Sequence, residues 1–144
     1  MIKGFRHVCL LVKDLERSLR FYRDILRLRV DKIITLKGSH LEKIFKIKNA
    51  ELIYTKMRSP DQPKKSQPIF ELHCWRRPRR LPRKNYSHVS FSVKNLDQTY
   101  KKLKRKGVKF IASPAISPDG KTKICFGYDP EGNLIEFMED LKKR

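Results

Sequence analysis

An internal repeat is the sequence feature that most constrains how this chain can fold. The ten residues that begin at His7 align with the ten that begin at His88, at a constant offset of 81 (88 − 7). Five of the ten positions are identical, and the last is acidic in both copies. Because self-similarity of this kind usually marks a repeated structural unit, the sequence predicts a duplicated module.

Each copy of the repeat begins with an alternating pattern and continues with a helical one. The alternation predicts a strand whose histidine, His7 or His88, lies on the face opposite the most apolar row of side chains. Asp14 and Asn95 follow as suitable helix N-caps, and Gly107 is placed to end the second helix. Each module is therefore predicted to open with a strand and a helix.

Strand-like segments follow each predicted helix and complete the module. They lie at residues 28–36, 50–57, 68–75, 108–111, 121–128 and 133–138. A short extra helix is predicted at 39–46 with Ser39 as its cap, and a tight turn at 129–133. The predicted fold is α+β, with two tandem β-α-β-β-β modules at residues 1–80 and 85–144 joined by a basic, proline-containing link.

The strongly basic composition raises the question of a nucleic-acid partner. The 144 residues carry 35 Lys and Arg against 15 Asp and Glu, a net charge of +20. However, the run at 76–84 is broken by prolines, the run at 101–106 is typical of a solvated helix surface, and no zinc-finger, RNP-like or P-loop motif accompanies them. We therefore interpret the charge as surface composition, which favours anionic ligands, and expect no nucleic-acid partner.

The distribution of apolar residues and cysteines bears on the compartment. No apolar stretch has the roughly 20 residues that cross a bilayer, and the first residues lack a signal-peptide core. Cys9, Cys74 and Cys125 are far apart and form no C-x-x-C pair, which argues against disulfides and thiolate zinc sites. We expect a cytoplasmic protein with reduced thiols and no membrane partner.

Two glutamates inside apolar strands are the candidates for chemistry. Glu71 and Glu136 occupy equivalent places in the final strands of the two copies, and each copy opens with a histidine, His7 or His88. A carboxylate is costly to bury unless it is paired or binds a metal. A single strand histidine is more often structural, but a matching His-Glu pair in both copies favours one four-ligand metal site.

The donor types narrow the choice of ion but do not fix it. Imidazole nitrogens with carboxylate oxygens suit zinc, nickel, cobalt, manganese or ferrous iron, and leave positions open for water or substrate. His73 lies on the same predicted strand face as Glu71 and is either a pocket residue or an alternative ligand. Cys9 shares the face of His7, where an inert buried thiol is the simpler interpretation.

With these motifs the sequence resembles the vicinal oxygen chelate superfamily, which includes glyoxalases, bleomycin-resistance proteins and extradiol dioxygenases. The resemblance is carried by residues 7–26, 69–72, 86–93 and 129–136 and spans nearly the whole chain. It implies paired modules whose strands curve around a metal cavity. It also implies a homodimer in which His7 and Glu71 of one chain meet His88 and Glu136 of its partner, around a divalent metal.

Within that superfamily the ligand pattern looks most like glyoxalase I, or lactoylglutathione lyase. The resemblance implies a lyase or isomerase in which the metal binds two vicinal oxygens of a small substrate, such as a glutathione adduct, and stabilises an enediolate. Glu136 or Glu71 would move the proton, and the sequence does not choose between them. Arg27 departs from the family pattern, which usually has glycine there.

Three alternatives stay open at this point. An extradiol-type dioxygenase would use His7, His88 and Glu136 as an iron triad but leaves Glu71 without a role. A methylmalonyl-CoA epimerase usually has paired histidines in the second module, where Ser87 precedes His88 here. A non-catalytic small-molecule binding or resistance protein would need no metal ligands.

Overall fold

One curved sheet of eight strands organises the chain in the computed structural model, which describes residues 1–25, 27–79, 86–128 and 132–142. The elements in chain order are β1 (Ile2–Leu11), α1 (Leu15–Leu19), the π-helical turn η1 (Arg20–Ile25), β2 (Arg29–Lys37), α2 (Ser39–Phe45), β3 (Glu51–Arg58), β4 (Phe70–Arg77), β5 (Tyr86–Val93), α3 (Leu96–Arg105), β6 (Ala115–Ile116), β7 (Thr122–Tyr128) and β8 (Leu134–Asp140). Within these described ranges, no helix has the length and apolar character needed to cross a membrane.

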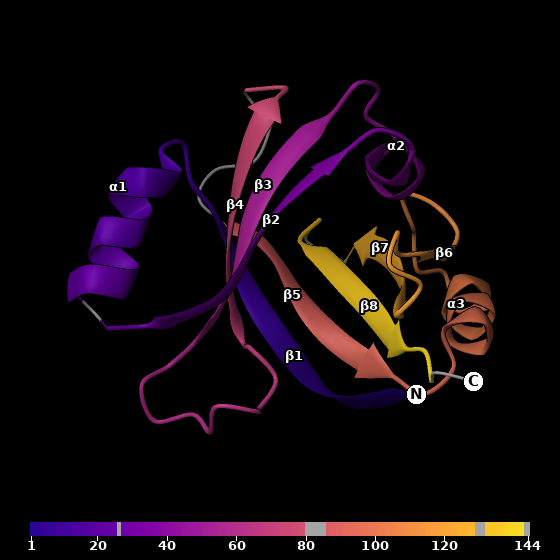
Figure 1. The fold of residues 1–144 in the computed structure, drawn as a ribbon. Coiled ribbons are helices and arrows are strands. Elements are labelled where there is room, and N and C mark those ends of the chain that lie inside the picture. The colour runs from indigo at the N-terminus through magenta and orange to yellow at the C-terminus, as the bar shows by residue number, and fades with distance from the viewer. Residues whose placement is uncertain (26, 80–85, 129–131, 143–144) are drawn as a thin grey trace.

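The two copies of the repeat meet through their first strands. The strand order is β2-β3-β4-β1-β5-β8-β7-β6, so β1 and β5 lie side by side in the middle of the sheet (Figure 1). They pair antiparallel, with His7 opposite Ser90 and Cys9 opposite His88. This reciprocal register is what a local two-fold relation between equivalent strands produces. The outer neighbours repeat the pattern, since β1·β4 and β5·β8 are both parallel.

The predicted helix starts are confirmed by their hydrogen bonds. The side chain of Asp14 accepts from the backbone N–H of Arg17, and Asn95 accepts from that of Gln98, each at 3.0 Å. Each cap satisfies one of the backbone donors that a helix start leaves free. Leu103 of α3 packs against the apolar core, while the basic residues of the helix lie on its exposed side, as the sequence predicted.

Several details differ from the sequence prediction. Gly38, with φ of 78°, rather than Ser39 is the N-cap of α2, and it makes no side-chain cap bond. The strand predicted at 108–111 is reduced to a single bridge from Phe110 to Gly127. Arg27 adopts a left-handed φ of 64°, a conformation that glycine adopts at lower cost. The link at 81–85 and most of the turn at 129–133 lie outside the described residues.

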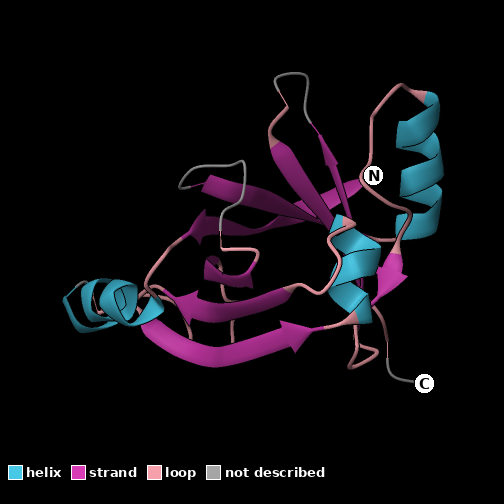
Figure 2. Ribbon diagram, turned by 90° about the horizontal axis from the view of Figure 1, so that it is seen from above, coloured by secondary structure: helices cyan, strands magenta, loops and turns pink. Residues whose placement is uncertain are grey.

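The helices divide the apolar core into separate clusters. On one side Leu19 of α1 packs with Met57 and Leu72, and near the other end of the sheet α3 covers a second cluster. Figure 2 shows how strongly the strands curve between these helical segments. The short α2 joins two further clusters, since Ile44 packs with strands of the second module and Leu41 with strands of the first. This helix therefore ties the two halves together across the curve of the sheet.

Candidate metal centre

The four candidate ligands come from four neighbouring strands. Glu71 lies on β4, His7 on β1, His88 on β5 and Glu136 on β8, in the order in which these strands adjoin. Cys9 of β1 is paired with Glu71 of β4 on one side and with His88 of β5 on the other. Two residues along, Ser90 of β5 is paired with His7 of β1 and with Glu136 of β8. Because directly paired residues point to the same face, all four side chains lie on one face of the sheet.

Three of these side chains converge on one point. The Nε2 atoms of His7 and His88 are 3.0 Å apart, and Oε2 of Glu136 lies 3.0 Å from the first and 3.3 Å from the second. Ligands about 2.1 Å from one ion are about 3.0 Å apart in an octahedral shell and about 3.4 Å apart in a tetrahedral one. The triangle of donor atoms thus has the dimensions of three ligands that share one metal ion.

The orientation of His88 is fixed by its neighbour in sequence. Its Nδ1 lies 2.8 Å from Oγ of Ser87. When Nδ1 carries the proton and donates to this hydroxyl, Nε2 keeps its lone pair and points toward Glu136. A hydrogen bond to the second ring nitrogen is the usual way in which proteins orient a metal-binding histidine.

Glu71 approaches the centre from the other side and has a different set of partners. Its Oε2 lies 3.5 Å from Nε2 of His7 and 3.1 Å from Nε2 of His73. His73 also lies near His88, with ring centroids 5.4 Å apart. The centre therefore contains a third histidine besides the two that the repeat predicts.

The cluster is buried, and its charges are tightly linked. His7, His88, Glu71 and Glu136 are 3, 1, 7 and 6 % exposed. Burial acts to raise the pKa of Glu136, but His88 and His7 hold it well below the ordinary value. Burial acts likewise on Glu71, where His7 and His73 keep the pKa lowered. Both carboxylates are thus held in the ionised form, so the buried centre attracts a cation.

The pKa values of the two histidines, His7 and His88, are shifted in opposite directions by their surroundings. Burial lowers the pKa of His7, but the carboxylates of Glu136 and Glu71 together raise it above its ordinary value. Burial and the neighbouring His73 and His7 lower the pKa of His88, in spite of Glu136. The neutral form of His88, which is the form that binds metals, is therefore favoured.

The residues present fit a divalent metal ion. Oε2 of Glu136 is buried and has no aligned hydrogen-bond partner in the described part of the chain, although it lies between two imidazole nitrogens. A buried anionic oxygen without a partner is costly. His7, His88 and Glu136 form a group of potential ligands by their donor positions, and imidazole with carboxylate suits the borderline divalent ions.

The structure brings all four candidate ligands together within one chain, whereas the family resemblance implies ligands shared between two chains. His7, Glu71, His88 and Glu136 all belong to one chain and approach one another within it. The reason is that β5 pairs with β1 of its own chain. Sharing of these ligands across a dimer interface stays a prediction.

Two residues, His73 and Ser87, contact the centre more closely than the sequence predicts. His73 was expected mainly as a pocket residue, and Ser87 only as a departure from an epimerase pattern. The period-two spacing from Glu71 correctly predicts that His73 lies on the same strand face. The position of Ser87 next to His88 in the sequence does not predict the hydrogen bond between its hydroxyl and the His88 ring. Cys9, fully buried, forms a second group of potential ligands with His73 and His88. Burial raises the pKa of its thiol well above the usual range.

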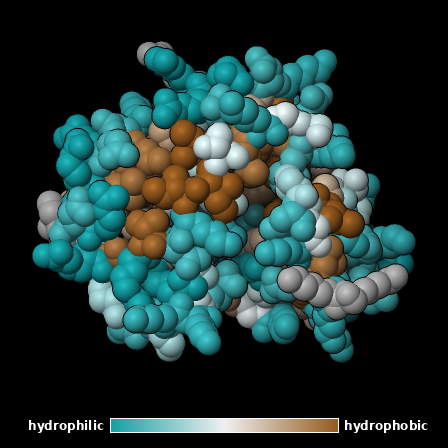
Figure 3. Space-filling model, in the orientation of Figure 1, coloured by the Kyte–Doolittle hydropathy of each residue, from teal (hydrophilic) through white to brown (hydrophobic). Residues whose placement is uncertain are grey.

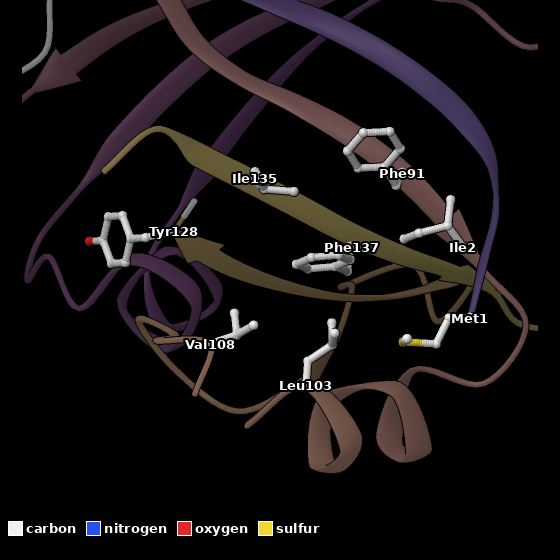
Figure 4. A pocket seen from close by; sticks show the side chains of 8 residues that line it. All are labelled: Met1, Ile2, Phe91, Leu103, Val108, Tyr128, Ile135 and Phe137. Atoms are coloured by element: carbon white, nitrogen blue, oxygen red, sulfur yellow. The ribbon is translucent and has the colours of Figure 1, made fainter. Parts of the chain in front are cut away.

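An apolar pocket lies on the other face of the sheet and is separate from this centre. It has a volume of about 330 Å³ and is bounded by Leu103 of α3 and by Phe91, Ile135 and Phe137 (Figure 4). Ile135 and Phe137 flank Glu136 in sequence, so strand alternation directs them away from the ligands. The residues that line the pocket are apolar or aromatic and carry no ionisable carboxylate, imidazole or amine side chain.

Comparison with known proteins identifies the family. Residues 4–137 match the family model of the Glyoxalase/Bleomycin resistance protein/Dioxygenase superfamily. The chain belongs to this superfamily. Members of it act on small molecules, and the curved mixed sheet seen here is its fold.

Named relatives share about a quarter of the sequence. The chain is 27% identical over 139 residues to a probable lactoylglutathione lyase from Synechocystis, with 96% of each chain covered. It is 28% identical over 135 residues to the lactoylglutathione lyase of Haemophilus influenzae, covering 93% of this chain and 90% of the relative.

Solved structures show the same fold at lower identity. The methylmalonyl-CoA epimerase of Mycobacterium tuberculosis superposes with a TM-score of 0.74 at 18% identity, covering 99% of this chain and 91% of that one. A hypothetical protein from Bacillus halodurans superposes with a TM-score of 0.66 at 17% identity, covering 97% and 96%. At this identity the likeness establishes the fold.

Proposed function

We propose that this superfamily member is a metal-dependent lyase or isomerase that moves a proton within a small oxygenated substrate, in the manner of lactoylglutathione lyase. The observation that carries the proposal is the triangle of His7, His88 and Glu136 donor atoms, with a second ionised carboxylate, Glu71, beside it. The names of the relatives support the reaction class.

Each residue of the centre has a distinct task in this proposal. His7, His88 and Glu136 would hold a divalent ion, with Glu71 as the fourth side chain of the site. When bound, the ion supplies Lewis-acid polarisation of two neighbouring substrate oxygens. Ser87 orients His88, and the burial of all four side chains excludes bulk water. A glutamate carboxylate beside the substrate takes a proton from one carbon and returns it to the next.

The metal part of the proposal is tested by ligand substitution. We expect His88→Ala and Glu136→Ala to weaken binding of zinc, cobalt or nickel by more than the roughly 10- to 100-fold that loss of an outer-shell partner costs. Metal content after dialysis, measured by mass spectrometry, reports the loss. Circular dichroism checks that both variants remain folded. Unchanged metal content in both variants contradicts the site.

The reaction class is tested separately with substrates. Methylglyoxal and glutathione are supplied to protein loaded with nickel, cobalt or zinc, and thioester formation is followed. Proton exchange on methylmalonyl-CoA in deuterated water is measured in parallel. Thioester formation that is lost in the Glu136→Ala variant supports the proposed reaction. Activity only in the second assay assigns an epimerase, and metal binding without either activity leaves a non-catalytic metal protein.

A further inference from the structure

The apolar pocket between α3 and the sheet is open to solvent at one end. Figure 4 shows Met1 and Ile2 at that end and Tyr128 at the other. Met1 and Ile2 are 54% and 48% exposed. The volume of about 330 Å³ falls within the range of roughly 300–1,000 Å³ that small-molecule sites occupy. The pocket is thus large enough and open enough to accept a ligand.

An aromatic row on the same face of the sheet leads from the surface into the pocket. Phe5 of β1 is paired with Phe91 of β5, which in turn is paired with Phe137 of β8. Directly paired residues point to the same face. Phe5 is 57% exposed, Phe91 is half-buried and Phe137 is 7% exposed. Exposed apolar surface that continues into a pocket is typical of a binding site.

A second, polar pocket adjoins the apolar one, and Met1 lines both. It has a volume of about 240 Å³ and lies against the first turns of α3. Two of the residues that line it are Lys94 and Lys102, and none is acidic. Both lysines are exposed, and neither forms an ion pair with any residue that the structure describes. An ammonium group only donates hydrogen bonds, so this pocket favours an anion.

Two acidic side chains near the start of α3 already have other partners. Oε2 of Glu139 accepts a hydrogen bond of 2.8 Å from the backbone N–H of Leu96. Oδ2 of Asp97 lies 2.7 Å from Nζ of Lys123. These carboxylates therefore leave Lys94 and Lys102 available to an anion from outside the chain.

We propose that the two adjoining pockets bind one amphipathic anion of the fatty-acid class, with its hydrocarbon chain in the apolar pocket and its carboxylate at Lys94 and Lys102. Burial of the chain supplies the affinity, and the lysines select a negative head group. They also argue against a second copy as the occupant, because a two-fold contact here would bring the lysines of both copies to one interface. The site lies on the face opposite the metal ligands and does not depend on the proposed function.

Isothermal titration calorimetry of metal-free protein with matched probes tests the site. We expect decanoate to bind at one molecule per chain, and acetate, which has the head group without the chain, not to bind. Decanol and decylammonium have the same chain without the negative charge, and both should bind more weakly than decanoate. Octanoate should also bind more weakly, by about fourfold for each methylene group that it lacks.

Substitutions separate the two parts of the site. Lys94→Gln combined with Lys102→Gln should weaken decanoate binding by about threefold to tenfold and leave decanol binding unchanged. Lys43→Gln combined with Lys48→Gln is the control, because it removes the same charge from exposed residues outside both pockets. Val108→Trp should fill the apolar pocket and abolish the binding of both probes. Ile2→Asp, at an exposed position of the pocket, should have the same effect on decanoate, and circular dichroism checks that each variant is folded.

Several outcomes overturn the inference. These are no saturable binding of decanoate, equal affinity for decanoate and decanol, or equal losses in the two double-lysine variants. A dimer that dissociates in Ile2→Asp, in protein that binds no decanoate, assigns the apolar pocket to a second copy instead. His88→Ala should bind decanoate as wild type does, since loss of binding there would place the carboxylate at the metal centre. Failure of decanoate binding leaves the proposed metal site standing, and failure of metal binding leaves this site standing.

Discussion

At the scale of single residues, the buried centre depends on charges that are paired nearby. Arg6, next to His7 in sequence, is only 5 % exposed, and its guanidinium donates two hydrogen bonds of 2.8 Å to Asp140. A buried cation is tolerated where it is paired and hydrogen-bonded, and Arg6 also donates to Ser92 Oγ. The hydrogen bonds from Arg6 also hold the pKa of Asp140 below its ordinary value of 3.8.

This pair leads to a pH-dependent stability prediction. A carboxyl whose pKa is lower in the folded state stabilises the fold above its unfolded pKa, and this contribution is lost as the pH falls through the folded pKa. We expect Asp140→Asn to reduce the free energy of unfolding by about 1 kcal/mol at pH 7, a modest figure because Asp140 is largely exposed.

Urea unfolding at several pH values measures the effect. The difference between Asp140→Asn and wild type should shrink as the pH falls below 3.8, the ordinary pKa of the carboxyl. Asp24→Asn is the control, because Asp24 and its partner Arg23 are both exposed. A pH-independent difference for Asp140→Asn would show that the charge is not its cause.

At the scale of elements, α2 is the segment that encloses the centre. Phe45, its last residue, lies with ring centroids 5.2 Å from Trp75 and 4.6 Å from Phe126. The ring of Phe126 in turn packs against the ring of His88, with their centroids 5.1 Å apart. An aromatic contact path thus leads from α2 to a ligand, and positive φ angles at Gly38 and Lys46 fix the chain at both ends of the helix.

Removal of the Phe45 ring should loosen this cover. We expect Phe45→Ala to lower the free energy of unfolding by about 2 kcal/mol, less than the roughly 3–5 kcal/mol for a fully buried phenylalanine, because Phe45 is half-buried. Trp75 is the single tryptophan of the chain, so its fluorescence should also become more accessible to acrylamide.

Denaturant unfolding and fluorescence quenching give the two measurements. Phe21→Ala provides the control, since Phe21 is 47% exposed and belongs to η1 rather than to α2. It should leave the quenching of Trp75 unchanged. Equal quenching in Phe45→Ala and wild type would mean that α2 does not shield this side of the centre.

At the scale of the whole molecule, the charge and the functional centre are separate. On the face in Figure 3, hydrophobic surface forms a central area and a smaller area toward the right, and hydrophilic side chains border both. The basic residues near the end of α3, Lys102, Lys104 and Arg105, complement the helix dipole there. The proposed function therefore depends on the buried carboxylates, not on the basic surface.

A mixing experiment tests whether the centre is complete in one chain. His7→Ala and His88→Ala variants are prepared separately, unfolded, mixed and refolded together. If each centre belongs to one chain, as the β1·β5 pairing indicates, the mixture should bind no more metal than either variant alone. Recovery of metal binding in the mixture would instead show that partner chains share ligands. The homodimer that the family resemblance implies remains a prediction, and size-exclusion chromatography with light scattering measures it.

The sequence alone determined the duplicated architecture, the strand faces and the identity of the four candidate ligands. It did so because alternation, helix caps and a repeat at a fixed offset are local properties. Whether His7 and His88 meet within one chain or across two was not local, since the same strand edge can pair with either copy. The antiparallel register of β1 on β5 shows that one chain is able to bring them together. The roles of Ser87 and His73 likewise required tertiary structure, because a hydrogen bond at 2.8 or 3.1 Å depends on side-chain direction that residue spacing does not specify.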